Sequence, residues 1–352
     1  MRVLLVGPEL LMPWTAYTAQ ALRRLGQKVR VFHETHLFLD RLTLQTGRRV
    51  VSCIPGLVRP MDRWRADWCQ RRDERLLQEA KSWQPDLIFV LWGKSWSARL
   101  LQRLKSEVRC RLVTWWTDDP FRNPTENIFP LYDTFFVFDR SYMAPLRQAG
   151  VQDVRFLPCA CDEAIFFPQA VGGSARRRYQ SQLALIAWYT PERYTPDRLE
   201  TLRALAQFQL KIWGRGWKSS GGSKPFKAAA QHVFQRERFI PDYEAALIYN
   251  ATEIGLNVHS VQTHEAGLNT RSFELLAAGA FELMDAVPGM EELLQPDREV
   301  VVYRSPEEAV SLARYYLQHP QQRKTIARQG RQKTLTQHTY RHRMRQLLEC
   351  AN

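Results

Sequence analysis

Short apolar runs alternate along the first half of the chain with segments of helical periodicity. The apolar runs have the length and composition of buried β-strands and lie at 3–6, 28–32, 85–92, 111–116, 134–138 and 153–158. Between them, apolar residues recur every three or four positions, which predicts helices over 15–26, 63–82 and 97–106. This alternation indicates a parallel sheet with helices on both faces.

The same alternation restarts after a break at 163–181, where Pro, Gly-Gly-Ser and three consecutive arginines predict a linker. Further strand-like runs lie at 183–188, 209–214, 253–258 and 299–303. We therefore predict an α/β protein with two Rossmann-like doubly wound domains, over 1–165 and 181–335, and a C-terminal helix over 336–352 placed to cross back to the first domain. Ligands bind beyond the carboxyl ends of strands in such sheets, so we expect a cleft between the domains.

The composition indicates the size class of the protein and the cellular compartment that suits it. With 352 residues, 45% hydrophobic and 24% charged, the chain has ordinary globular composition and is long for a single core. Its six cysteines form no CxxC pair, which favours reduced thiols. The first apolar run ends at Gly7, too early for a signal peptide or a membrane span. We expect a cytoplasmic protein, with a peripheral position at the membrane surface left open.

The formal charge of +14 has two interpretations, an anionic partner or a solubilising surface. Segment 59–75 sets Trp64 and Trp68 four residues apart, among the basic residues Arg63, Arg65, Arg71, Arg72 and Arg75. Such a helix suits a membrane interface or a nucleic acid. It is equally consistent with tryptophans packed on the first domain and solvated arginines. Both interpretations stay open.

The stretch "GLNTRSFELLAAGAFELMD" places charged residues at the mouth of an otherwise apolar helix. A helix N-terminus carries unpaired N–H groups and about half a positive charge, so it attracts phosphate. Gly267 and Asn269 provide the approach, Thr270 a hydroxyl, and Arg271 a guanidinium for bidentate phosphate contact. Glu274 is placed to accept both hydroxyls of a ribose. The alternative is an exposed Arg–Glu pair on an amphipathic helix.

Several motifs together resemble a known family. "YNATEIGLNVHS", "LNTRSFELLAAGAFELMD", "PGMEELL" and "HTYRHRM" closely resemble the C-terminal half of CgeB-type (spore-maturation) glycosyltransferases, and "PDLIFVLWG" and "TWWTDDP" resemble the N-terminal half. The resemblance covers about 83–348 in unbroken order. It implies the GT-B architecture, with a nucleotide-sugar donor on the C-terminal domain, the acceptor on the N-terminal domain, and no metal. It also implies that Glu274 holds the donor ribose while basic residues hold the diphosphate.

The chain departs from the pattern of related enzymes at two places. Many retaining GT-B enzymes have two glutamates eight positions apart, but Ala266 stands eight residues before Glu274, with Glu265 one place off. The choice between retention and inversion therefore stays open. The first strand of the second domain usually leads into a glycine, whereas here it leads into "WYTPERYTPDR". Arg193 and Arg198 remain candidates for the diphosphate, or solvated helix residues.

Other candidates lie at strand ends. Asp118 and Asp119 follow a buried strand in "WWTDDPF", where one could act as general base on an acceptor hydroxyl, and we favour Asp118. The alternatives are a DxD-like metal site or an Asp that caps the next helix. His259 follows the strand "GLNV", and Arg215 lies in the turn "WGRGW"; both are candidates for donor contact. The cysteines and histidines show no metal-ligand spacing.

The sequence therefore predicts a metal-independent glycosyltransferase without a bound cofactor. Its co-substrate would be a UDP-, GDP- or dTDP-linked sugar, and it would transfer a hexose to an acceptor hydroxyl. Arg271 and the helix dipole would stabilise the departing diphosphate. The acceptor is hypothesised to be a large anion, either a membrane-associated glycan or lipid or a nucleic acid. The alternatives are a nucleotide-sugar epimerase and a non-catalytic module that binds nucleotides or nucleic acids.

Overall fold

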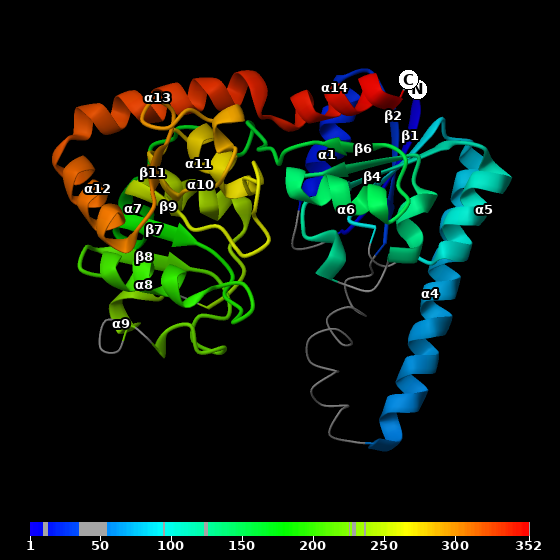
Figure 1. Cartoon of the computed structure of the whole chain (residues 1–352), viewed down its shortest axis with the longest axis horizontal. Helices are drawn as coiled ribbons and strands as arrows, with labels where there is room; N and C mark the ends of the chain where they lie inside the picture. Colours follow the sequence, from blue (N-terminus) through cyan, green and yellow to red (C-terminus); the bar gives the residue numbers. More distant parts are fainter. Residues whose placement is uncertain are drawn as a thin grey trace. The chain divides into compact units, whose positions relative to one another are not determined.

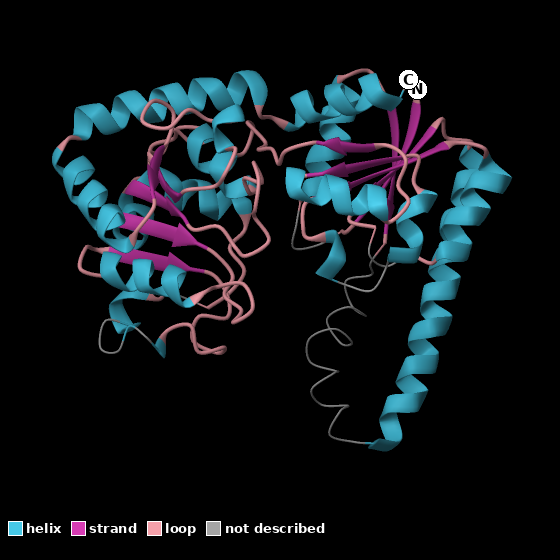
Figure 2. Cartoon of the chain, in the orientation of Figure 1, coloured by secondary structure: helices cyan, strands magenta, loops and turns pink. Residues whose placement is uncertain are grey.

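The chain folds into two compact units, seen in a computed structural model (Figure 1). Unit 1 comprises Met1–Val137, Tyr142–Leu157 and Met344–Asn352, and unit 2 comprises Phe138–Ser141 and Pro158–Arg343. The structure describes residues 1–9, 13–34, 55–93, 96–122, 126–224, 226, 230–235 and 237–351. Figure 2 shows the strands of each unit's sheet flanked by helices.

Unit 1 is built on a six-stranded parallel sheet of order β2-β1-β3-β4-β5-β6. Its strands are β1 (Arg2–Gly7), β2 (Lys28–His33), β3 (Leu87–Leu91), β4 (Arg111–Trp116), β5 (Thr134–Val137) and β6 (Val154–Phe156). The helices are α1 (Trp14–Arg24), α4 (Pro55–Trp83), α5 (Ala98–Val108) and α6 (Met143–Gln148), with 3₁₀ turns η2 (Pro120–Arg122) and η3 (Glu126–Leu131). Strands β3, β4 and β5 are buried almost throughout, as their continuous apolar runs predict.

Unit 2 is built on a five-stranded parallel sheet of order β11-β10-β9-β7-β8. Its strands are β7 (Ser181–Ile186), β8 (Leu210–Trp213), β9 (Thr252–Asn257), β10 (Glu282–Asp285) and β11 (Val301–Tyr303). The helices are α7 (Gly173–Tyr179), α8 (Pro196–Leu205), α9 (Ala230–Val233), α10 (Asp242–Ala251), α11 (Thr270–Ala277), α12 (Pro306–Gln318) and α13 (Pro320–Gln337). The helix α14 (Tyr340–Ala351) begins in unit 2 and ends in unit 1.

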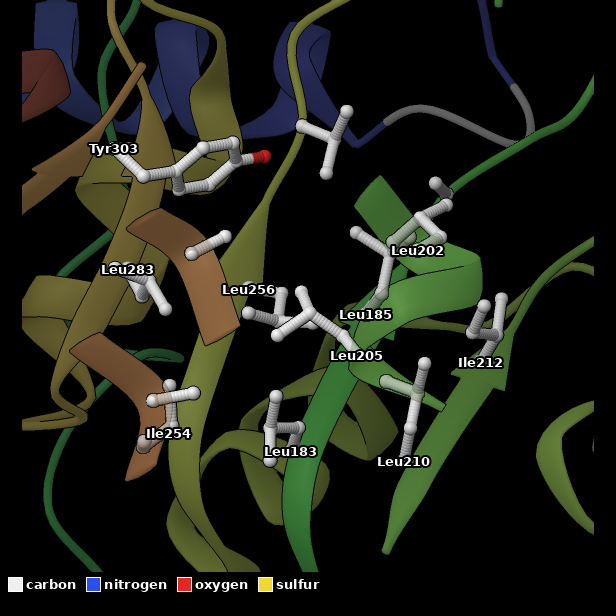
Figure 3. Close-up of a cluster of buried hydrophobic side chains, with 14 of the residues drawn as sticks. Leu183, Leu185, Leu202, Leu205, Leu210, Ile212, Ile254, Leu256, Leu283 and Tyr303 are labelled. Carbon is white, nitrogen blue, oxygen red and sulfur yellow. The ribbon is translucent and has the colours of Figure 1, made fainter. Parts of the chain in front are cut away.

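The core of unit 2 follows the two-residue period of its strands. Alternate side chains, among them Leu183, Leu185, Leu256 and Leu283, form one fully buried cluster (Figure 3). Helices α8 and α12 cover this cluster. On strand β9, Gly255 lets α11 approach closely, because a Cβ there would lie 2.3 Å from a methyl carbon of Leu275. Substitution of Gly255 would therefore displace the helix that carries the charged motif.

The interpretation of 163–181 as a linker is wrong for its second part. Residues Gly173–Tyr179 form helix α7, and Tyr179 is buried in unit 2. Its hydroxyl donates to a carboxylate oxygen of Glu244 at 2.9 Å, and its ring packs edge-on against Trp213. The polar composition of the segment hid this helix, because a single aromatic side chain anchors it.

The "CAC" segment is held by the chain's C-terminal part. The backbone N–H of Cys161 donates to the carbonyl of His338, and the N–H of Tyr340 donates to the carbonyl of Cys161. Arg343, 4% exposed, donates to the carbonyls of Pro158 and Cys159. These contacts give the segment a structural role, and burial lowers the pKa of Arg343 to about 10.

The strand order marks where a ligand is expected in each unit. In unit 2 the chain moves outward from β7 to β8 and then returns to the other side of β7 to form β9. In unit 1 the equivalent reversal lies between β1 and β3. Open parallel sheets bind ligands beyond the carboxyl ends of the strands at such a reversal. In unit 2 that place lies beside the helix mouth singled out by sequence.

Candidate functional site

The mouth of α11 is formed by a side-chain cap. Asn269 stands before the first helical residue with extended backbone, and its side-chain oxygen accepts the N–H of Ser272 at 3.3 Å. The amide of Asn269 donates to the side-chain oxygen of Asn257, at the end of β9, at 3.0 Å. The helix start is therefore tied to the carboxyl end of the central strand.

Asn257 also holds Arg271. Its side chain is fully buried, and its oxygen accepts a hydrogen bond from Nη1 of Arg271 at 3.1 Å. The amide group of Asn257 donates to Ser272 Oγ at 2.8 Å and to Glu282 Oε1 at 2.9 Å. The alternative of an exposed Arg–Glu surface pair is therefore wrong for Arg271, which is half-buried and fixed from below. Sequence reasoning missed Asn257 and Glu282, although a polar residue inside an apolar strand is the signal that could have found them.

Glu282 is a fully buried carboxyl at the start of β10. Burial raises its pKa to about 8, although hydrogen bonds from Asn257 and Ser272 and the charge of Arg271 act in the opposite direction. Its Oε2 has no hydrogen-bond partner among the described residues. A carboxyl in this setting is mostly protonated at neutral pH.

Glu274 lies one turn into α11 and is half-buried. Burial raises its pKa, and the negative charge of Asp242 at the start of α10 adds to the effect. The charge of Arg271 and a hydrogen bond from Thr270 oppose it. Thr270, Arg271 and Glu274 are thus close enough to interact, as the sequence motif predicts.

A second pair lies at the ends of β9 and β10. His259 is 1% exposed, and its Nδ1 lies 2.7 Å from Oδ1 of Asp285, which also accepts the backbone N–H of His259 at 2.9 Å. Burial acts to raise the pKa of Asp285, but the contacts with His259 outweigh it and hold this pKa below its ordinary value. Nε2 of His259 is buried without a partner in the described part of the chain. Asp285 was also missed by sequence reasoning.

The loop after β7 and the start of α8 carry further cations, Arg193 and Arg198. Arg198 donates to the carbonyl of Ser260 at 3.4 Å and lies 4.0 Å from a carboxylate oxygen of Asp285. Burial raises the pKa of Tyr194 to about 12, against the positive charges of Arg271, Arg198 and Arg193. All three arginines are therefore close enough to Tyr194 to act on its pKa.

Gly267 has a packing role. A Cβ at this position would lie 2.1 Å from a carboxylate oxygen of Asp139. The same oxygen accepts the backbone N–H groups of His264 and Glu265 at 2.6 and 3.0 Å. Asp139 thus fixes the loop that leads into α11.

The position eight residues before Glu274 is a buried alanine with left-handed backbone. Ala266 has φ +54° and is fully buried, whereas the neighbouring Glu265 is exposed. A second site glutamate at that spacing is therefore absent from this chain, as the sequence indicates.

Arg215 lies between two glycines that the fold requires. Gly214 and Gly216 have positive φ values, and a Cβ at either would lie 2.0 Å from a carbonyl oxygen of the loop after β7. The guanidinium of Arg215 lies over the ring of Trp188, 5.7 Å from its centre. The backbone conformation and the close contacts therefore explain why glycine stands at both positions. A role of Arg215 in binding a ligand stays a prediction.

In unit 1, Asp118 and Asp119 follow the end of β4. Asp118 is 6% exposed. Asp119 accepts the N–H of Phe121 at 2.9 Å, so it caps the short turn η2 that begins at Pro120. The capping interpretation thus applies to Asp119, and a catalytic role of either residue stays a prediction.

The basic segment 59–75 forms part of α4. The side chains of Arg63, Trp64 and Arg65 lie outside the described residues. Of the two interpretations left open, the anion-binding surface does not include Arg72: its side chain is 2% exposed and lies over the ring of Trp96, 4.0 Å from the centre. It also pairs with Asp73 at 2.8 Å. Arg71 and Arg75 are exposed.

Two other kinds of feature are absent from the described ranges. No cluster of three or more His, Cys, Asp and Glu side chains is arranged there to hold a metal ion. No helix there combines the length and hydropathy that crossing a membrane requires.

Comparisons with known proteins identify similar sequences. Residues 196–349, which contain α11 and the arginines around it except Arg193, match the model of a family described as glycosyl transferase-like. The chain is also 22% identical to spore protein CgeB of Bacillus subtilis over 309 residues, which covers 81% of this chain and 92% of CgeB. The predicted resemblance to CgeB-type proteins is thereby confirmed.

Solved structures of low sequence identity share the whole fold. Sucrose-phosphate synthase from Thermosynechococcus elongatus superposes with a TM-score of 0.64 at 17% identity, over 99% of this chain and 98% of that one. HepE from Anabaena, in complex with UDP and glucose, superposes with a TM-score of 0.67 at 12% identity, over 99% of each chain. The expected GT-B fold is confirmed.

Proposed function

We propose that this protein is a glycosyltransferase that moves a hexose from a nucleoside-diphosphate donor to an acceptor hydroxyl without a metal ion. The observation that carries the proposal is the placement of Arg271 and Glu274. Asn257 holds the guanidinium at the carboxyl end of β9, and Glu274 lies one turn away beside a strand-order reversal. The HepE structures contain UDP, glucose or UDP-glucose, so a UDP-linked hexose is the first donor to test.

The proposed chemistry assigns each group a task. The N–H groups at the mouth of α11 and the guanidinium of Arg271 bind the diphosphate and stabilise the charge that grows on it as the glycosidic bond breaks. Glu274 accepts the ribose hydroxyls. Arg193, Arg198 and His259 bind the remaining phosphate or sugar oxygens.

The acceptor side is proposed for unit 1. Asp118 follows a buried strand and is itself buried, so a hydroxyl that reaches it would meet a carboxylate able to accept or orient its proton. The acceptor remains proposed to be a large anion.

The test of the proposed function uses the full chain and a panel of UDP-, GDP- and dTDP-linked sugars, with nucleotide release as the readout. Slow hydrolysis of one donor without an acceptor is the expected result, and it should persist in EDTA. Interconversion of the sugar while it stays on the nucleotide would point to an epimerase. Binding of a donor with no release over hours would point to a non-catalytic module, and restoration by Mn²⁺ after EDTA would contradict metal independence.

Glu274→Ala is expected to weaken donor binding by about 1–3 kcal/mol, because the ribose hydroxyls would lose their acceptor in a half-buried place. Calorimetry with the donor found in the panel measures the effect. Glu291→Ala, which removes an exposed carboxylate of the same unit, is the matched control. Equal donor affinity of a folded Glu274→Ala variant and the wild type would remove Glu274 from the site.

Asp118→Asn is expected to keep donor affinity and to lower kcat about a hundredfold, the usual effect of losing a positioned base. Steady-state kinetics with the acceptor, or single-turnover donor hydrolysis until the acceptor is known, measures it. Asp119→Ala is the comparison, because loss of its cap should lower stability more than turnover. Wild-type turnover of Asp118→Asn would leave this residue a structural role only.

A further inference from the structure

A cavity of about 510 Å³ opens in unit 2 at the end of the sheet opposite to the α11 mouth. It lies where β9 and β10 begin, since Thr252, Glu253 and Phe281 line it. Helix α13 forms another part of its lining and packs along α11, as Figure 1 shows. We call this cavity the α13 pocket. It takes no part in the proposed donor site.

One wall of the α13 pocket is cationic. Its basic lining residues are Arg323, Lys324, Arg328 and Arg331, all from α13. Residues four apart on a helix are surface neighbours, so Lys324 lies beside Arg328 on the same face of α13. Helix α13 contains no Asp or Glu along its 18 residues. Among the described residues that line the pocket, Glu253 alone is acidic.

Two of these cations are held in place by the protein. Arg323 donates to Glu253 Oε2 at 2.7 Å and to the carbonyl of Leu317 at 3.0 Å, and its side chain is 12% exposed. Arg331 donates to the carbonyl of Ala277 at 3.3 Å, so it offsets the partial negative charge at the end of α11. The negative charge of Glu253 is therefore neutralised by Arg323, and the partial negative charge at the end of α11 by Arg331.

The other two cations have no compensation. Lys324 and Arg328 are exposed, and neither has a hydrogen-bond or ion-pair partner in the described part of the chain. They face a hollow that small residues leave open, since Ala278, Gly279 and Ala280 line the side next to α11. Gly279 has φ +76°, and a Cβ there would lie 3.0 Å from the ring of Pro168, so a larger residue is disfavoured.

We propose that the α13 pocket binds the phosphate group of a small phosphorylated ligand. A guanidinium fork and an ammonium that converge on one hollow are the groups that proteins use for phosphate. The positive charge there is unbalanced, whereas Arg72 on α4 is buried and paired. Part of the excess positive charge of this chain thus lies at the α13 pocket. The proposed phosphate site does not depend on the proposed glycosyltransferase function.

The test is a calorimetric titration of the full chain with inorganic pyrophosphate. Lys324→Gln/Arg328→Gln should weaken the pocket's binding event by about tenfold or more, because two charge-assisted contacts are lost. Arg304→Gln/Arg314→Gln removes the same charge from exposed positions of the same unit outside the pocket, and it should titrate like the wild type. Arg271→Ala is the third variant and removes any event at the mouth of α11.

The three variants distinguish a phosphate site in the α13 pocket from one at the mouth of α11. If Lys324→Gln/Arg328→Gln titrates like the wild type, or if the Arg304/Arg314 control loses as much affinity, the α13 pocket is not a phosphate site. If Arg271→Ala titrates like the wild type while Lys324→Gln/Arg328→Gln loses the binding event, the proposed donor site fails and the pocket stands. Vesicles of phosphatidylcholine with phosphatidic acid form a second arm. Binding to them that depends on Lys324 and Arg328 would identify a lipid headgroup as the source of the phosphate, and its absence a soluble ligand.

Discussion

Arg271→Ala is expected to lower kcat/KM with the nucleotide-sugar donor by about a hundredfold to a thousandfold. This is the effect of removing a hydrogen-bonding cation that faces developing negative charge. The guanidinium is held by Asn257 at 3.1 Å, so it is oriented before the ligand arrives. Charge on the diphosphate grows as the glycosidic bond breaks, and an oriented cation therefore stabilises the transition state more than the bound donor. The loss should consequently fall mainly on kcat.

Two further variants sharpen this result. Arg271→Lys keeps the charge but loses the fork geometry, so we expect an activity between those of the wild type and Arg271→Ala. Arg304→Ala removes an exposed arginine of the same unit and should leave kcat unchanged. If a folded Arg271→Ala variant keeps wild-type kcat, the residue does not contact the departing diphosphate.

Glu282→Gln is expected to remove the contribution of this carboxyl to the loss of stability that the wild type suffers as pH rises. The pKa of Glu282 is about 8 in the folded protein, against an ordinary value of 4.5. Between these values the folded state holds a proton that the unfolded state has released. The free energy of unfolding therefore falls with rising pH through this window, by about 1.4 kcal/mol per pH unit from this one group. Below pH 4.5 and above pH 8 the group adds no slope.

Urea unfolding at several pH values from 5 to 8.5 measures the difference. Glutamine resembles the protonated carboxyl, so the variant should match the wild type near pH 5 and exceed its stability by a few kcal/mol near pH 8.5. Glu274 adds its own slope to both proteins, so the difference between them isolates Glu282. Glu291→Gln, at an exposed position, should follow the wild type throughout. Parallel curves for Glu282→Gln and the wild type would mean that Glu282 is ionised in the folded protein at neutral pH.

The sequence by itself predicts the elements and the mouth of α11. Strand and helix periods are local properties, so the runs at 111–116 and 253–258 identify β4 and β9 to within a residue or two. The helix start is local as well, since Asn269 caps it and Arg271 and Glu274 follow within its first turn and a half. The segment 163–181 is an exception to this local prediction. Its polar composition predicts a linker, but burial of Tyr179 anchors its second part as helix α7.

Only the tertiary structure decides what supports these residues and which charges are available. Asn257, Glu282 and Asp285 lie on β9 and β10, and the pairing of these strands brings them under the α11 mouth. Burial sets the pKa of Glu282 and withdraws Arg72 from the surface, while α13 presents Lys324 and Arg328 to an open pocket. The physical reason is that desolvation and side-chain pairing depend on neighbours far apart in sequence, whereas period and capping depend on residues within one turn or strand.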